Sequence, residues 1–145
     1  MKKLKIYLDV CCYNRPFDDQ TRDIIRLEAE AIIRILNDVQ TNEYDVVGSE
    51  VIDYEISRME DPEKKEKVEE LVRIAKKYVM VATAEVARAS ELARLGIGAF
   101  DALHLSCAEK SGADFFLTTD KRLLRLAEST GRSCTFGRQI RCIGS

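Results

Sequence analysis

Four short, β-rich apolar runs separated by long helical segments constrain the fold of this chain more than any other feature. The runs are Leu4–Leu8 (LKIYL), Tyr44–Val47 (YDVV), Tyr78–Ala82 (YVMVA) and Asp114–Leu117 (DFFL). Strands that alternate with helices pair in parallel and are joined by right-handed crossovers. The pattern therefore predicts an α/β protein, a three-layer α/β/α domain with a central parallel sheet of four to five strands.

The segments between these runs have helical spacing. Apolar residues recur three or four positions apart at Ile25, Ile32, Ile35, Leu36 and Val39, and again at Val68, Leu71, Val72 and Ala75. The expected N-caps are Ser49, Asp61 before Pro62, and Thr83, and Gly96 and Gly112 fit positions just past helix ends. Residues 131–145 are harder to interpret, because Arg138–Ile143 could form a short edge strand or remain disordered.

Length and composition favour one soluble domain over residues 1–145. A domain of this size buries about 68–70% of its unfolded surface, which is enough for a core without covalent staples. The five cysteines contain no CxxC pair and there is one histidine, so we expect neither a disulfide framework nor a zinc site, and reduced thiols favour a cytoplasmic protein. The first apolar run stops at Asp9, too short for a signal sequence, and no run reaches the roughly 20 residues of a membrane span.

Four carboxylates recur where this fold would bring them together. Asp9 follows the first predicted strand, the helix with Glu55 follows the second, Asp120 follows the fourth, and Asp101 lies in the first turn of a helix. In parallel sheets, sites form beyond the carboxyl ends of the strands. Because carboxylates repel one another, such a group usually binds a hard divalent cation or works as a general acid and base.

Each acid also has a purely structural interpretation. Asp120 before KRLLRLA is a natural N-cap, and Asp101 suits the positive end of a helix dipole. Asp9 at a strand end loses hydration and needs a partner.

Glu55 is the most informative acid, because it shares the apolar face of its helix with Val51, Ile52 and Met59. An inward carboxylate requires a cation. The alternative to a metal is a buried ion pair, with Arg15, Arg22 or Arg26 as the partner.

Bound Mg²⁺ or Mn²⁺ would supply the nucleophile by lowering the pKa of a water molecule. No side-chain nucleophile is then required, and His104, one turn from Asp101, is expected to support a site acid or to be a satisfied surface residue. Six basic residues and only Glu128 opposing them lie between positions 121 and 145. Lys121, Arg122 and Arg125 directly follow Asp120, and they either hold substrate phosphate or form a solvated surface.

Three segments carry a resemblance to a known family: IYLDVCCYN, SEVIDYEI and FDALHLSCAEKSGADFFLTTDKRLL. In order and spacing they resemble the PIN-domain family, which includes the VapC-type toxins of toxin–antitoxin pairs. The resemblance implies a Mg²⁺- or Mn²⁺-dependent ribonuclease with an RNA substrate. The implied site acids are Asp9, Glu55, Asp101 and Asp120, with Thr118 or Thr119 as a polar neighbour. It also implies a possible antitoxin partner and a homodimer.

Val10 and Cys11 depart from this pattern, because they replace the small polar residues that often follow the first aspartate. Two other functions stay open. One is a degenerate PIN domain that acts as an RNA-binding or interaction module. The other is a phosphatase with Asp9 as covalent nucleophile, although enzymes of the haloacid dehalogenase kind have a second aspartate where Cys11 stands. Vicinal Cys11 and Cys12 are expected to be buried small hydrophobes rather than redox groups.

Overall fold

The five strands of this chain form one parallel sheet with the order β3-β2-β1-β4-β5. The structure is a computed structural model that describes residues 3–130 and 140–142. The strands are β1 (Leu4–Leu8), β2 (Tyr44–Ser49), β3 (Lys77–Val79), β4 (Phe115–Thr118) and β5 (Ile140–Cys142). The predicted parallel sheet is confirmed, and β5 lies inside the stretch predicted as a possible edge strand. The rest of that stretch lies outside the described residues.

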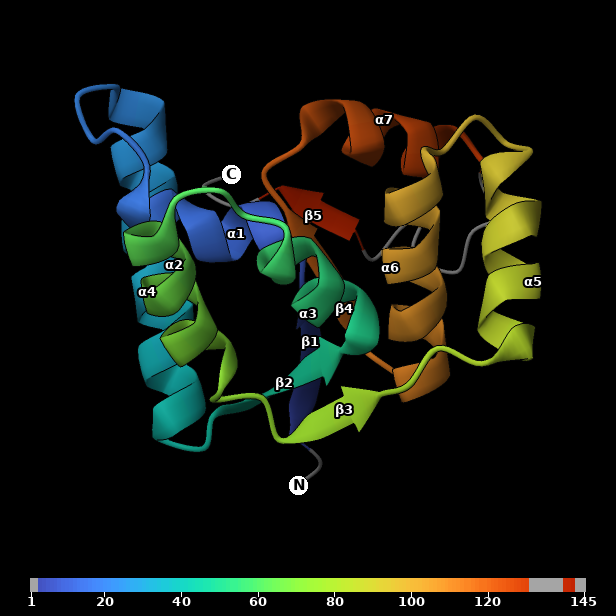
Figure 1. Cartoon of the computed structure of the whole chain (residues 1–145), viewed down its shortest axis with the longest axis horizontal. Coiled ribbons are helices and arrows are strands. Elements are labelled where there is room, and N and C mark those ends of the chain that lie inside the picture. The colour runs from blue at the N-terminus through green and yellow to red at the C-terminus, as the bar shows by residue number, and fades with distance from the viewer. Residues whose placement is uncertain (1–2, 131–139, 143–145) are drawn as a thin grey trace.

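Helices cover both faces of the sheet. They are α1 (Val10–Asn14), the 3-10 helix η1 (Arg15–Phe17), α2 (Asp23–Gln40), α3 (Glu50–Ser57), α4 (Pro62–Val72), α5 (Thr83–Ala93), α6 (Ala99–Ser111) and α7 (Lys121–Ser129). Figure 1 shows α2 and α4 on one side of the strands and α5 and α6 on the other. The three predicted layers are therefore present, and among the described helices none is both long and apolar enough to cross a membrane.

Two predicted boundaries differ from those in the structure. Thr83 was expected to cap a helix, but α5 begins at Thr83 and Ala82 occupies the capping position. The strand predicted at Tyr78–Ala82 is Lys77–Val79 instead. Beyond Val79, the amide of Val81 donates to Oε1 of Glu50 at 2.6 Å. The Glu50 side chain thus accepts the hydrogen bond of a backbone amide that could otherwise have paired with a neighbouring strand.

The core includes the second half of β1, where the successive residues Ile6, Tyr7 and Leu8 are buried, so both faces are covered there, as expected of a central parallel strand. Tyr7 is fully buried, and its ring stacks on Phe116 of β4 with centroids 5.4 Å apart and planes 9° apart. Cys12 is also fully buried, as predicted, whereas Cys11 is only partly buried.

The carboxyl end of β1 lies at the point where strand order reverses. From β1 the chain adds β2 and β3 on one side, and β4 and β5 then extend the sheet on the other. The amide of Asp9 donates to the carbonyl oxygen of Leu117 at 3.0 Å, which joins β1 and β4 where they separate. In open parallel sheets this switch point is the usual place for a site.

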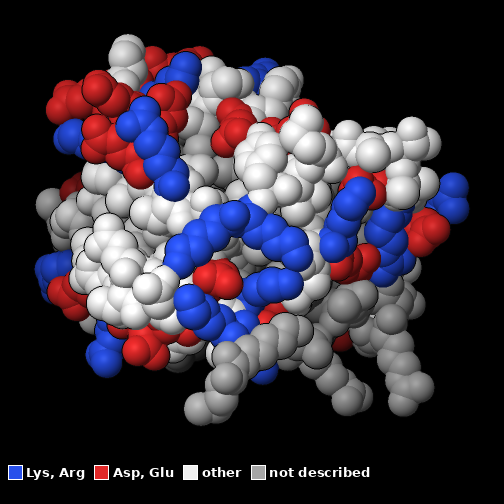
Figure 2. Space-filling view, turned by 90° about the horizontal axis from the view of Figure 1, so that it is seen from below, with Lys and Arg blue, Asp and Glu red and all other residues white. Residues whose placement is uncertain are grey.

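The surface near the amino ends of the strands, opposite to the switch point, is rich in basic side chains, as Figure 2 shows from below. There Lys77 donates to the carbonyl oxygen of Ser111, the last residue of α6, at 3.1 Å. Crowding by Lys77 lowers the pKa of Lys5. Gly112 ends α6 in the left-handed conformation, with φ of 73°. Cations suit the negative end of a helix dipole, so Lys77 stabilises the carboxyl end of α6.

Candidate functional site

Asp9 lies between β1 and α1, where it is the N-cap of α1, and both of its carboxylate oxygens have partners. The side chain is buried, and its Oδ1 accepts a 2.8 Å hydrogen bond from the amide of Val10. Its Oδ2 accepts a 3.0 Å hydrogen bond from the hydroxyl of Thr118. The strand-end acid therefore has the polar partners that its burial requires.

Thr118 connects Asp9 to Asp120. Its Oγ1 also accepts a 3.0 Å hydrogen bond from the amide of Asp120. Asp120 is exposed, and its Oδ1 accepts from the amides of Arg122 and Leu123. The predicted N-cap role of Asp120 is confirmed, and the cap also fixes its carboxylate at the carboxyl end of β4.

Glu55 is held by a histidine and not by an arginine. Its Oε1 lies 2.6 Å from Nε2 of His104, and the Glu55 side chain remains 29% exposed. Of the three arginines proposed as partners, Arg15 pairs with Asp18 and Glu28 and Arg26 pairs with Asp23. Among the described residues, Glu55 forms no ion pair with Arg22. The alternative of a Glu55–arginine pair was therefore wrong.

His104 is fully buried, so its interpretation as a surface residue was wrong. Its Nδ1 lies 2.7 Å from the hydroxyl of Tyr7, which in turn lies 2.8 Å from Oγ of Ser49. Its Nε2 is also 4.0 Å from Oδ1 of Asp9. The imidazole thus stands between two of the predicted site acids.

Asp101 lies in the first turn of α6, as predicted, and is partly buried. Burial, together with the charges of Asp9, Asp120 and Glu55, raises the pKa of its carboxyl to about 6, and His104 opposes this rise. Among the described residues, none donates a hydrogen bond to this carboxylate. Asp101 is therefore a partly buried carboxyl on which the other three acids act as like charges.

The four acids come together, but they do not form a finished set of ligands. Within the described residues, no three Asp, Glu, His or Cys side chains are placed to hold one ion together. Hydrogen bonds explain this, because Glu55 is turned to His104 while Asp9 and Asp120 bind hydroxyl or amide groups. The donors are nevertheless carboxylate oxygens, which hard cations such as Mg²⁺ and Mn²⁺ prefer. The residues present fit such an ion in donor type and in charge.

The other predicted residues surround this group. Thr119 is buried, and its amide donates to Sγ of Cys11 at 3.4 Å. The basic residues Lys121, Arg122 and Arg125 are exposed on α7, and none forms an ion pair with a carboxylate of the described residues. They are therefore accessible to a ligand.

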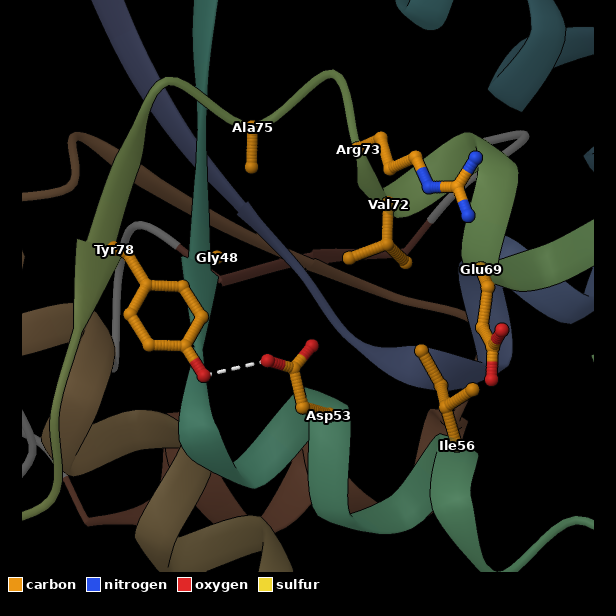
Figure 3. Close-up of a pocket in the computed structure, with 8 residues that line it drawn as sticks. All are labelled: Gly48, Asp53, Ile56, Glu69, Val72, Arg73, Ala75 and Tyr78. Carbon is orange, nitrogen blue, oxygen red and sulfur yellow. Dashed lines mark hydrogen bonds between the residues drawn. The ribbon is translucent and has the colours of Figure 1, made fainter.

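A cleft of about 420 Å³ lies elsewhere, between the β2–β3 edge and helices α3 and α4. Figure 3 shows Tyr78 and Asp53 pointing towards one another across it, with the Tyr78 hydroxyl donating to Asp53 at 2.5 Å. Burial and this carboxylate raise the pKa of Tyr78. None of the four acids lines this cleft, so it is separate from the acids predicted from the sequence.

Sequence reasoning missed the buried polar residues behind the acids. The sequence pattern predicts Tyr7 only as part of an apolar strand and Ser49 only as an N-cap. In the structure, Oγ of Ser49 both accepts from the amide of Ile52 and lies 2.8 Å from the Tyr7 hydroxyl. The sequence of β1 does not predict the contact between the Tyr7 hydroxyl and His104, because tyrosine is common in strands whatever its hydroxyl binds.

Comparisons with known proteins agree with this architecture. A family model described as PIN domain matches residues 25–129, a span that includes Glu55, Asp101 and Asp120 and begins after Asp9. Among solved structures, one matching chain is from the crystal structure of VapBC2 from Rickettsia felis bound to a DNA fragment from their promoter. It has a TM-score of 0.56 and 14% sequence identity, and the match covers 85% of this chain and 93% of that chain. No curated protein matched the sequence.

At 14% identity the VapBC2 chain shows a common fold alone. The family match is stronger evidence of relationship, because it spans well over half of the 145 residues and includes three of the four acids. The five-stranded parallel sheet between helical layers is the architecture that the strand and helix pattern predicted. The chain belongs to the PIN-domain family.

Proposed function

We propose that this protein is a metal-dependent ribonuclease that hydrolyses RNA phosphodiester bonds at the acids Asp9, Glu55, Asp101 and Asp120. The observation that carries the proposal is the convergence of acids from four separate segments at the switch point of the sheet. Carboxylates that are held close together lower the stability of the folded protein unless a cation binds between them. Such groups of acids are therefore candidates for a functional site. Membership of the PIN-domain family supports the same chemistry.

The four carboxylates would hold Mg²⁺ or Mn²⁺, which supplies a Lewis acid and lowers the pKa of a bound water when present. Hydrogen bonds within the protein orient the carboxylate oxygens of two of these acids. Thr118 and the Val10 amide fix the plane of Asp9, and the first turn of α7 fixes Asp120. Asp101 has no such donor among the described residues, so it has the most freedom to adjust.

Basic residues of α7 support a phosphate-bearing substrate. Lys121 and Arg122 begin the helix directly after Asp120, and Arg125 follows one turn later. Exposed cations beside a cluster of acids allow a polyanion to approach a site that would otherwise repel it. We assign these three residues, with Thr118 and Thr119, to the substrate side of the site.

A toxin role follows as part of the proposal. The VapBC2 structure is named as that complex with a promoter DNA fragment, and its fold is shared by this chain. We propose that the chain is the toxin of such a pair, that it binds an antitoxin protein and that it forms a homodimer. Cys11, Cys12 and Cys107 are free thiols, which suits the reducing cytoplasm.

The direct test incubates the purified protein with mixed structured RNAs in Mg²⁺, in Mn²⁺ and in EDTA. We expect cleavage with either metal and none in EDTA. Asp9→Asn protein, purified in the same way, controls for contaminating ribonucleases. Cleavage that persists in EDTA, or that is equal in both proteins, would contradict the proposal.

A second function, an RNA-binding module without catalysis, is favoured by one observation. Among the described residues, the acids do not complete a set of three ligands. Such a module would bind RNA with the salt dependence of a phosphate contact yet leave it uncut in every metal. The same incubation, read by gel shift as well as by cleavage, separates the two functions.

A further inference from the structure

His104 and its neighbours form a continuous hydrogen-bonded relay in the core. The relay runs from the Ile52 amide through Ser49, Tyr7 and His104 to Glu55, over contacts of 3.2, 2.8, 2.7 and 2.6 Å. Ser49, Tyr7 and His104 are fully buried. Only the last member, Glu55, reaches solvent, with 29% of its side chain exposed.

The direction of this relay follows from what each group can donate. An ionised carboxylate only accepts, so Nε2 of His104 carries the proton that Glu55 binds. In a neutral imidazole Nδ1 then accepts, and Tyr7 is its donor. Burial raises the pKa of Tyr7 well above its usual value, which keeps this hydroxyl protonated. Tyr7 in turn accepts from Ser49, and every group in the relay is satisfied.

We propose that His104 is a positioning residue for Glu55, which holds Oε1 through Nε2 and leaves Oε2 for the metal ion of the ribonuclease site. The inference rests on the proposed function, which makes Glu55 a ligand. Tyr7 and Ser49 act through His104, because they fix the ring plane and the tautomer. The Nε2 atom also lies 4.0 Å from Oδ1 of Asp9, so the ring sets the separation of the two acids.

A role in packing alone does not account for this arrangement. Burying polar side chains costs free energy unless each is hydrogen-bonded, and an apolar side chain would fill the same space without that requirement. The relay ends on the one acid that lies on the apolar face of α3. Ligands are commonly oriented by such hydrogen bonds, and the loss of one typically costs about 10- to 100-fold in metal affinity.

Two substitutions of similar size separate positioning from packing. In His104→Gln the amide nitrogen takes the place of Nε2, so the bond to Glu55 is kept while that to Tyr7 is lost. In His104→Asn the amide takes the place of Nδ1, so Tyr7 keeps its partner and Glu55 loses it. Both variants are first melted in EDTA to compare their stability.

Mn²⁺ affinity, measured by electron paramagnetic resonance of the free ion without RNA, is the main readout. We expect His104→Asn to bind Mn²⁺ about 10- to 100-fold more weakly than wild type and His104→Gln to stay near wild type. Equal losses in both variants, or no loss in either, would overturn the inference. In cleavage assays His104→Asn should recover rate as Mn²⁺ is raised.

A spectroscopic measurement on the wild-type chain does not depend on either variant folding. His104 is the sole histidine, so its ring nitrogens give unambiguous ¹⁵N signals. We expect a proton on Nε2, and a clear shift of that nitrogen in Glu55→Ala protein. A ring protonated on Nδ1 alone, or an Nε2 signal that Glu55→Ala leaves unchanged, refutes the contact.

The outcomes also distinguish this inference from the proposed function. Wild-type protein that binds Mn²⁺ but cuts no RNA overturns the ribonuclease and leaves the positioning role standing. Metal-dependent cleavage that both His104 variants retain at low Mn²⁺ overturns the positioning role alone.

Discussion

The hydroxyl of Thr118 donates a 3.0 Å hydrogen bond to Oδ2 of Asp9, although the two residues are 109 positions apart in sequence. The contact joins the carboxyl ends of β1 and β4, neighbours in the sheet, at the point where strand order reverses. Together with the Val10 amide, which donates to Oδ1, this contact orients both carboxylate oxygens of Asp9 before any ligand binds. Preorganised oxygens of this kind are what a tight cation site requires.

Asp9→Asn should nearly abolish RNA cleavage and leave the fold intact. The amide can still accept from the Val10 amide, but it loses the charge that a hard cation needs. Cleavage rate and circular dichroism measure the two effects. As a milder companion, Thr118→Val keeps the charge of Asp9 but removes both the donor to Asp9 and the acceptor for the Asp120 amide, and it should weaken Mn²⁺ binding by about 10- to 100-fold. Wild-type cleavage by a folded Asp9→Asn protein would exclude this acid from the site.

Glu55→Gln should lower metal-dependent cleavage far more than Glu50→Gln does. Glu50 accepts a 2.6 Å hydrogen bond from the amide of Val81, which a glutamine oxygen can also accept, and it makes no described contact with the other acids. The two variants are compared at limiting Mn²⁺, where a lost ligand has its largest effect. An inactive Glu50→Gln beside an active Glu55→Gln would reverse the assignment.

Reversing the charges of Lys121 and Arg122 should weaken RNA binding and flatten its dependence on salt. Each lost phosphate contact lowers the slope of log affinity against log salt by about 0.7 for a single strand. The matched control is Arg34→Glu with Arg73→Glu, which changes net charge equally at two other exposed arginines. Filter binding over a salt series measures both slopes. Similar slopes in the two double variants would show that α7 is only solvated surface.

Asp101→Asn should stabilise the metal-free protein more at pH 8 than at pH 4. The pKa of Asp101 rises from 3.8 to about 6 on folding, so the folded state binds the proton more tightly than the unfolded state. This stability is present below pH 3.8 and is lost as pH rises through about 6. Asparagine cannot lose a proton and avoids that loss. Thermal melts in EDTA across this range measure it, and a variant destabilised equally at both pH values would make Asp101 part of the scaffold.

Mn²⁺ should relieve the repulsion among the four acids. At about 100 times its dissociation constant it should stabilise wild type by about 2.7 kcal/mol, a rise of several degrees in melting temperature. Asp101→Asn should gain much less, because it has lost both the repulsion and a ligand. Melts of both proteins with Mn²⁺ and with EDTA provide the measurement. Equal gains would mean that Asp101 does not touch the ion.

The sequence by itself determined the architecture and the edge at which the acids meet. Alternating strand and helix patterns require parallel pairing, and parallel strands place every carboxyl end at one edge. Asp9 and Asp120 follow β1 and β4 for that reason alone, and the helical period places Glu55 on the inner face of α3. These are local properties of spacing, so one chain suffices to read them.

Only the tertiary structure decided which group each acid meets. Helical spacing gives the face on which Glu55 lies, but its partner depends on how α3 packs against α6, which brings in His104 instead of an arginine. The shortened β3 likewise depends on Glu50 reaching the amide of Val81 from another segment. Hydrogen bonds between distant segments are chosen when the core packs, because a buried polar group must find its partner among whatever neighbours the packing supplies.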